Sequence, residues 1–99
     1  MEGWIVAFQL PPRASAADRV RFNHGFWGRT TSSWGGKYRY RVPGLMQEVP
    51  HRRLIRGVFL VRRQDRDRVV AFLEKWKAEF YVRQVRLERG DLGPLKESG

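Results

Sequence analysis

The pattern of apolar and polar positions along the chain predicts four strands and two helices. Continuous apolar, β-branched and aromatic runs predict buried strands over Gly3–Leu10 and Arg52–Arg63. Strict alternation over Lys37–Val42 predicts a half-exposed strand, and Phe80–Leu87 predicts a fourth. Between these segments, Gly28–Gly36 has the composition of a loop.

Two segments have helical spacing instead. Asp65–Ala78 places Val69, Leu73 and Trp76 on one side of a helix. A second helix is expected from Ala16 to about Phe26, with a buried stripe of Ala17, Val20, His24 and Trp27. Ser15 followed by Asp18 is typical of a helix N-terminal capping box.

The resulting order is β-α-β-β-α-β, which indicates an α+β fold with a small antiparallel four-stranded sheet and two helices, ferredoxin-like or similar. In that fold the first and third strands are central, in agreement with their apolar residues, and the charged second and fourth strands are edges. Two helices cover one face of such a sheet, so the other face is expected to expose apolar side chains to a ligand or to a second copy in a homodimer.

The length of 99 residues predicts one domain over residues 1–90, and the Gly, Pro and charged composition after Leu87 predicts a flexible tail over residues 91–99. The absence of cysteine excludes disulfides, thiol catalysis and cysteine-ligated metals. The N-terminus lacks a signal-peptide pattern and no apolar run approaches 18 residues, so a cytoplasmic protein without membrane contact is expected.

The charge is large and unevenly placed. The net charge is +10, and residues 1–63 hold 12 basic and 3 acidic residues, against 8 and 7 in residues 64–99. Nine basic residues and one acidic residue lie between Arg29 and Arg63. Such segregation favours an anionic partner, whereas the excess of arginine over lysine (16 to 4) is also typical of a GC-rich genome or a hot habitat.

Cations and aromatic residues alternate from Trp34 to Arg41. An extended strand would place Lys37, Arg39 and Arg41 on one face at intervals of about 7 Å. Tyr38 and Tyr40 would then lie on the other face, either in the core or as platforms for bases, while the loop residue Trp34 either stacks or folds back. Arg52, Arg53 and Arg56 either contact phosphates or belong to the ordinary solvated surface, and the sequence leaves both alternatives open. The candidate nucleic-acid-binding residues are Arg29, Trp34, Lys37, Tyr38, Arg39, Tyr40, Arg41, Arg52, Arg53 and Arg56.

An enzyme is not expected. The two histidines, His24 and His51, have no suitably spaced carboxylate, and no cluster suits a metal or another cofactor. The length and the turn after the first strand resemble the small CRISPR-associated ribonucleases with a ferredoxin-like fold. That family has a metal-binding Asp where this chain has Gln9, so the resemblance implies the fold and not the nuclease activity.

Trp34–Arg41, together with Arg52, Arg53, Arg56 and Phe59, also resembles the DNA-binding domain of the archaeal ThermoDBP proteins and their relatives. This resemblance implies a thermophilic archaeal source and a cleft lined by aromatics and flanked by cations. The function expected is non-specific binding of single-stranded DNA by a basic track and aromatic stacking. The alternatives are an RNA-binding component of a ribonucleoprotein and, third, a metal-dependent nuclease.

Overall fold

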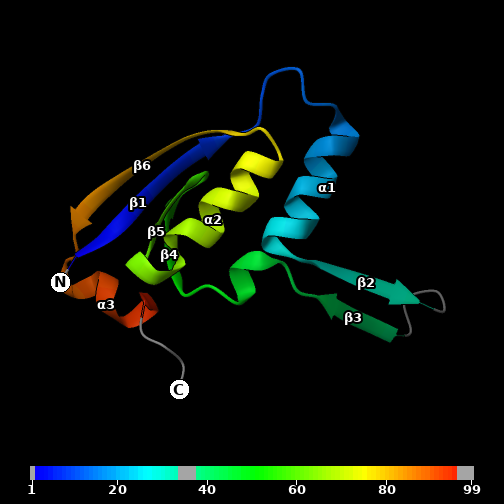
Figure 1. Ribbon diagram of the computed structural model, residues 1–99. Helices are drawn as coiled ribbons and strands as arrows, with labels where there is room; N and C mark the ends of the chain where they lie inside the picture. Colours follow the sequence, from blue (N-terminus) through cyan, green and yellow to red (C-terminus); the bar gives the residue numbers. More distant parts are fainter. Residues whose placement is uncertain (1, 34–37, 96–99) are drawn as a thin grey trace. The chain divides into compact units, whose positions relative to one another are not determined.

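A computed structural model describes residues 2–33 and 38–95 of the chain (Figure 1). The chain divides into two compact units. The sheet unit comprises the chain up to Arg13 and from Val49 onward, and the ribbon unit comprises Ala14–Glu48. The expectation of a single domain, made from the length of the chain, remains a prediction.

The sheet unit contains an antiparallel four-stranded sheet in the order β4-β5-β1-β6. Its strands are β1 (Glu2–Gln9), β4 (His51–Ile55), β5 (Val58–Val61) and β6 (Glu79–Arg86). The apolar strands β1 and β5 are central, as expected, and β6 with Arg83 and Arg86 is an edge. Burial on both sides explains why β1 and β5 lack the alternation of the edges.

The strand expected over Arg52–Arg63 is in fact a hairpin of β4 and β5. Ile55 pairs with Val58, so Arg56 and Gly57 form the turn between the two strands. Gly57 has φ +79°, and a Cβ at this position would lie 2.7 Å from the Phe8 carbonyl oxygen. Only glycine fits this combination of a positive φ and a close backbone approach. The prediction missed the turn because its only signal was one glycine within an apolar run.

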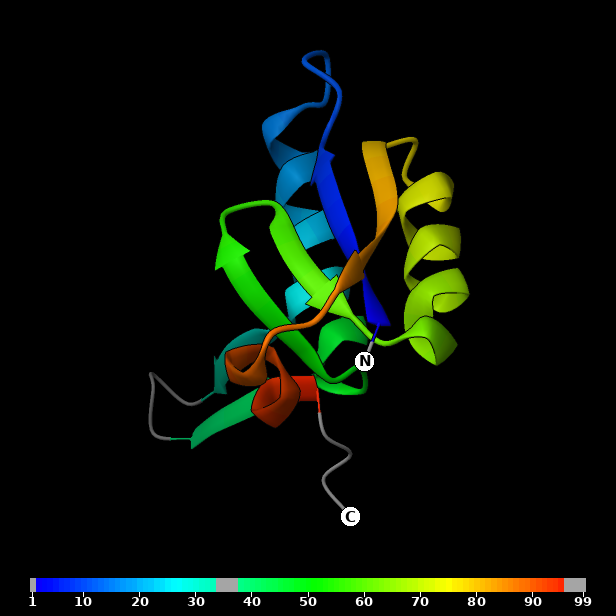
Figure 2. The same cartoon turned by 90° about the vertical axis from the view of Figure 1, so that its left-hand side faces the viewer.

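The alternation of side chains gives the sheet two faces. The α2 face carries Trp4, Val6, Phe59 and Val61, and the last three are fully buried. Helix α2 (Arg63–Lys75) lies against this face (Figure 2). It packs through the fully buried Val69 and Leu73, two of the residues that the helical spacing predicted, and the Arg66 guanidinium lies 4.4 Å from the centre of the Trp4 ring. These contacts form the core of the sheet unit.

The other face carries Ile5, Ala7, Leu60 and Tyr81 and is called the α3 face. Helix α3 (Arg89–Leu95) contacts β4 and β5 here, and its residues Asp91 and Leu95 are buried. Residues 91–95 are therefore part of the fold and not of a flexible tail. The composition hid this helix, because glycine and proline occur within it and one apolar side chain anchors it.

The ribbon unit contains helix α1 (Ala16–Trp27), a two-stranded antiparallel sheet and a short 3₁₀ helix, η1 (Leu45–Gln47). The Ser15 hydroxyl accepts a hydrogen bond from the Asp18 N–H (3.0 Å), which confirms the predicted start of α1. The buried residues of α1 are Phe22 and Phe26, whose rings stack 5.2 Å apart, while Ala17 and Val20 are exposed. The stripe predicted for this helix is therefore wrong by about half a turn.

The two strands of the ribbon are β2 (Arg29–Ser33) and β3 (Tyr38–Val42). β3 corresponds to the predicted second strand but is not an edge of the four-stranded sheet, where β4 takes that place. Its partner β2 lies in the segment expected to be a loop, because its polar RTTSS sequence has no apolar signal. The structure is thus a small α+β fold with three α-helices and two antiparallel sheets within the described residues.

Candidate nucleic-acid interface

The base of the ribbon is fixed by side-chain and backbone contacts within the ribbon unit. The Gln47 amide nitrogen donates to the Trp27 carbonyl oxygen (2.7 Å), and the Gln47 amide oxygen accepts from the Gly44 N–H. A Cβ at Gly44 would lie 2.7 Å from the Phe26 carbonyl oxygen. The chain after β3 is therefore held tightly against the end of α1, and this contact positions β2 and β3.

The described side chains of the ribbon are exposed, and two of them, Arg29 and Arg41, are basic. Arg29 pairs with Val42 in the register and Thr30 pairs with Arg41, and the side chains of all four are exposed. Tyr40 lies opposite Thr31, and 57% of its surface is exposed. The question left open by the sequence is therefore answered for Tyr40, which is not a core residue and presents its ring at the surface.

Four candidate residues lie wholly or partly outside the described part of the chain. Trp34 and Lys37 fall outside the described residues. Tyr38 and Arg39 lie in β3, opposite Ser33 and Ser32, and their side chains fall outside the description. The predictions made for these four side chains remain predictions.

The carboxylates of the ribbon unit, Asp18 and Glu48, lie near its two ends in sequence. The residues between them, 19–47, hold six basic residues and no acidic residue. Positive charge without neighbouring carboxylates raises the electrostatic potential at a surface and attracts polyanions. The exposed tyrosine and the cations therefore share one acid-free segment.

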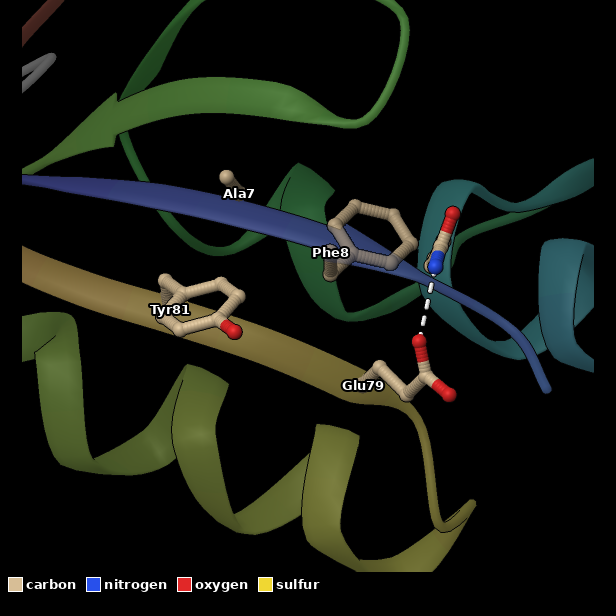
Figure 3. A pocket seen from close by; sticks show the side chains of 5 residues that line it. Ala7, Phe8, Glu79 and Tyr81 are labelled. Atoms are coloured by element: carbon tan, nitrogen blue, oxygen red, sulfur yellow. Dashed lines mark hydrogen bonds between the residues drawn. The ribbon is translucent and has the colours of Figure 1, made fainter.

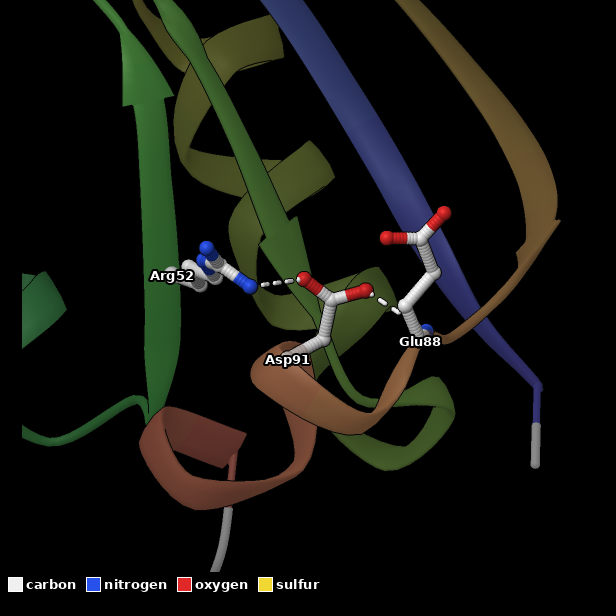
Figure 4. A network of polar contacts seen from close by, with 3 residues as sticks. All are labelled: Arg52, Glu88 and Asp91. Carbon is white, nitrogen blue, oxygen red and sulfur yellow. Dashed lines mark hydrogen bonds and ion pairs between the residues drawn. The ribbon is translucent and has the colours of Figure 1, made fainter.

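The candidate arginines of the sheet unit have different environments. Arg56 is exposed in the β4–β5 turn, and Arg53 is exposed in β4. Arg52 is instead half-buried, and its Nη1 donates to Asp91 Oδ1 at 2.5 Å (Figure 4). Asp91 Oδ2 also accepts from the Glu88 N–H (2.8 Å), so this carboxylate fixes both Arg52 and the start of α3. Arg52 has a structural partner, whereas Arg56 is presented at a turn.

Several aromatic residues are buried or half-buried. Phe26 is fully buried and meets the Trp27 ring edge-on at 4.8 Å. Trp4 and Trp76 are half-buried in the sheet unit. One exposed aromatic was missed, since Tyr81 in β6 exposes 70% of its surface. The exposure of Tyr81 could have been predicted from its position in an edge strand of alternating pattern, beside Val82 and Arg83. That strand was considered only for its charged residues.

No arrangement for metal chemistry is found in residues 2–33 and 38–95, where no group of three His, Asp or Glu residues could hold an ion. Gln9 donates a hydrogen bond from its amide to Glu79 (2.7 Å). In the same residues, no helix is both long enough and apolar enough to cross a membrane.

Comparison with known proteins gives this chain no relative. No protein-family model, no curated protein and no solved structure matches it.

Proposed function

We propose that this protein binds single-stranded nucleic acid, DNA in the first instance, with little sequence preference. The observation that carries the proposal is the exposed Tyr40 on a two-stranded ribbon whose sequence, residues 29–42, has four basic and no acidic residues. Single-strand binders combine a positive surface that follows the backbone with aromatic rings on which bases stack. In the ribbon register Tyr40 lies on the same face as Arg29, and Arg41 lies on the opposite face, so the Tyr40 face offers a ring together with one described cation.

Phosphates would contact the exposed Arg29 and Arg41, and Arg53 and Arg56 of the sheet unit would add contacts of the same kind. Trp34, Lys37, Tyr38 and Arg39 belong to the proposal on their sequence alone. Arg52 is left out, because pairing with a phosphate would strip Asp91 of its partner. The sequence resemblance to the ThermoDBP proteins supports the same function, and a relation of this chain to that family is likewise proposed.

The fold supports this proposal in one further respect. Without the ribbon, η1 and the last helix α3, the elements read β1, α1, β4, β5, α2, β6, and the sheet order β4-β5-β1-β6 is that expected of a ferredoxin-like sheet. We therefore infer a ferredoxin-like arrangement with the ribbon inserted before β4. Under this proposal the ribbon is an addition to a common scaffold, which is where binding functions are often placed.

The test is a salt titration with a fluorescent oligo-dT. Each phosphate neutralised on a single strand contributes about −0.7 to the slope of log affinity against log salt, so five contacts give about −3.5. A slope near zero, or no binding at low salt, would contradict the proposal. Competition with single-stranded and duplex RNA and DNA then distinguishes DNA binding from the alternative, a ribonucleoprotein component, for which RNA would be the stronger competitor.

A further inference from the structure

The registers of the sheet unit align four side chains in one row across the α3 face. Ile55 pairs with Val58, Val58 with Ala7, and Ala7 with Tyr81, so the row crosses all four strands. We call these residues the apolar row. Its two ends are exposed, Ile55 by 68% and Tyr81 by 70%, and its centre contains the small Ala7. The row is thus a shallow trough with raised apolar ends.

Helix α3 covers the neighbouring row on the same face. That row consists of Arg52, Leu60, Ile5 and Arg83, paired in this order. Asp91 of α3 binds Arg52, and Leu60 and Leu95 are each only 5% exposed (Figure 4). The helix therefore covers the β4–β5 side of the second row, while Arg83 on β6 remains exposed beside Tyr81.

A hollow lies at the Tyr81 end of the apolar row. It has a volume of about 180 Å³ and is lined by Ala7, Phe8, Gln9, Glu79 and Tyr81, which Figure 3 shows on the adjacent strands β1 and β6. Pockets for drug-sized ligands measure about 300–1,000 Å³, so this hollow is suited to a single flat group rather than to a whole small molecule. The ring of Tyr81 is available as one wall.

The charged residues around the hollow indicate which kind of ligand group would bind there. The Arg83 guanidinium lies 5.9 Å from the centre of the Tyr81 ring, and Arg56 is exposed in the turn next to Ile55. On the opposite side, Glu79 is held by the Gln9 amide. An anionic backbone would follow Arg83 and avoid Glu79, leaving a planar uncharged ring over Tyr81 and Ala7. A nucleotide combines these two parts, an anionic phosphate and a planar uncharged base.

We infer that the apolar row is a second contact surface for single-stranded nucleic acid, with one base stacked on Tyr81 and the adjoining phosphate on Arg83. The inference rests on the proposed function, but it concerns different residues and a different unit from the ribbon. Stacking of a base on an exposed aromatic side chain contributes about five- to 150-fold in affinity.

The test uses the full chain and oligo-dT that carries iodouracil, which crosslinks on irradiation to an aromatic ring stacked against it. Trypsin releases Tyr81 in the peptide Ala78–Arg83, AEFYVR, whose fragment masses separate Tyr81 from Phe80. We expect the crosslink on Tyr81. We also expect Tyr81→Ala to weaken oligo-dT binding at least about fivefold, whereas Tyr81→Phe retains the ring and the affinity.

A matched pair of arginine variants controls for net charge. Arg83→Ala and Arg68→Ala remove the same charge, but Arg68 is exposed on α2, which packs on the opposite face of the sheet. We expect the slope against log salt to fall by about 0.7 for Arg83→Ala only. Circular dichroism verifies that each variant is folded, as expected for replacements of exposed side chains.

Three results are distinguishable. Absence of oligo-dT binding by the unaltered protein contradicts the proposed function itself. Normal binding by Tyr81→Ala, with crosslinks only outside Ala78–Arg83, overturns the second surface and leaves the proposed function intact. A dimer in sedimentation that Tyr81→Ala dissociates, with unchanged oligo-dT binding, also overturns it and assigns the apolar row to a second copy of the chain.

Discussion

The Arg52 guanidinium and the Asp91 carboxylate, 39 residues apart in the sequence, form an ion pair of 2.5 Å that ties α3 to the edge strand β4. The side chain of Asp91 is only 10% exposed and accepts a second hydrogen bond from the Glu88 N–H. A carboxylate this buried needs its donors, because an unpaired buried charge is costly. Because of this ion pair, the residues of α3, whose composition is typical of a tail, belong to the sheet unit.

Replacing Asp91 tests this role of the carboxylate. We expect Asp91→Asn to lower the free energy of unfolding in urea by about 1–3 kcal/mol, because it removes the charge from both hydrogen bonds. Asp67→Asn is the control, since Asp67 is 94% exposed and lies 3.9 Å from Arg66. Its effect is expected within about 0.5 kcal/mol. Equal effects of the two variants would show that Asp91 does not anchor α3.

Substitutions of Arg52 and Arg56 are predicted to change different properties, the stability of the fold for Arg52 and the binding of nucleic acid for Arg56. Arg52→Ala leaves Asp91 without its cation and is expected to cost about 1–3 kcal/mol of stability. Arg56→Ala removes an exposed turn cation, so we expect unchanged urea unfolding and a salt slope lower by about 0.7. The two measurements on both variants form the check. If Arg52→Ala altered only the salt slope, Arg52 would be a phosphate ligand after all.

Tyr40 is predicted to contribute to affinity and not to folding. Its ring is 57% exposed, so we expect Tyr40→Ala to weaken oligo-dT binding by about 1–3 kcal/mol with little change in the unfolding midpoint. Tyr40→Trp preserves a stacking surface and should bind at least as well as the unaltered protein. Fluorescence anisotropy measures both. A loss of stability as large as the loss of affinity would place Tyr40 in a structural role.

Gly57 is predicted to be indispensable for the β4–β5 hairpin. We expect Gly57→Val to cost about 1–3 kcal/mol, since a branched residue at φ +79° is strained and its Cβ would approach the Phe8 carbonyl. Gly93→Ala is the control in α3, because nothing outside the adjoining residues and the helix backbone lies within 4 Å of the added Cβ. Its effect is expected to be well below that of Gly57→Val, although the following Pro94 limits any gain in stability. Thermal unfolding followed by circular dichroism compares the two.

The sequence was sufficient wherever a local signal carried the structure. Apolar runs marked β1 and β5 as central strands, and helical spacing placed Val69 and Leu73 in the core. Ser15 marked the start of α1 because a cap is a contact between residues three apart. The alternation over Lys37–Val42 likewise predicted a strand, observed as β3, but it left open whether Tyr40 belongs to the core, which the structure decides by exposing this residue.

The sequence failed where an element has no apolar pattern of its own. β2 is polar and is a strand because it pairs with the next strand, β3, with Ser33 opposite Tyr38. α3 is held against the sheet by the buried Leu95 and by Asp91, which pairs with Arg52 far back in the chain. The exposure of Tyr81 was equally hidden, because the two faces of an edge strand have the same alternation and only the packing of α2 and α3 distinguishes them.

The sequence by itself therefore determined the main strands and helices, the charge segregation and the candidate chemistry of Tyr40 and Arg41, since these follow from local spacing and composition. Only the tertiary structure decided which arginines are engaged in the fold and which apolar side chains remain exposed. Arg52 and Arg56 have the same side chain four residues apart, and the presence of Asp91 beside one of them separates their roles. Such differences arise from contacts that close long loops, which no local pattern encodes.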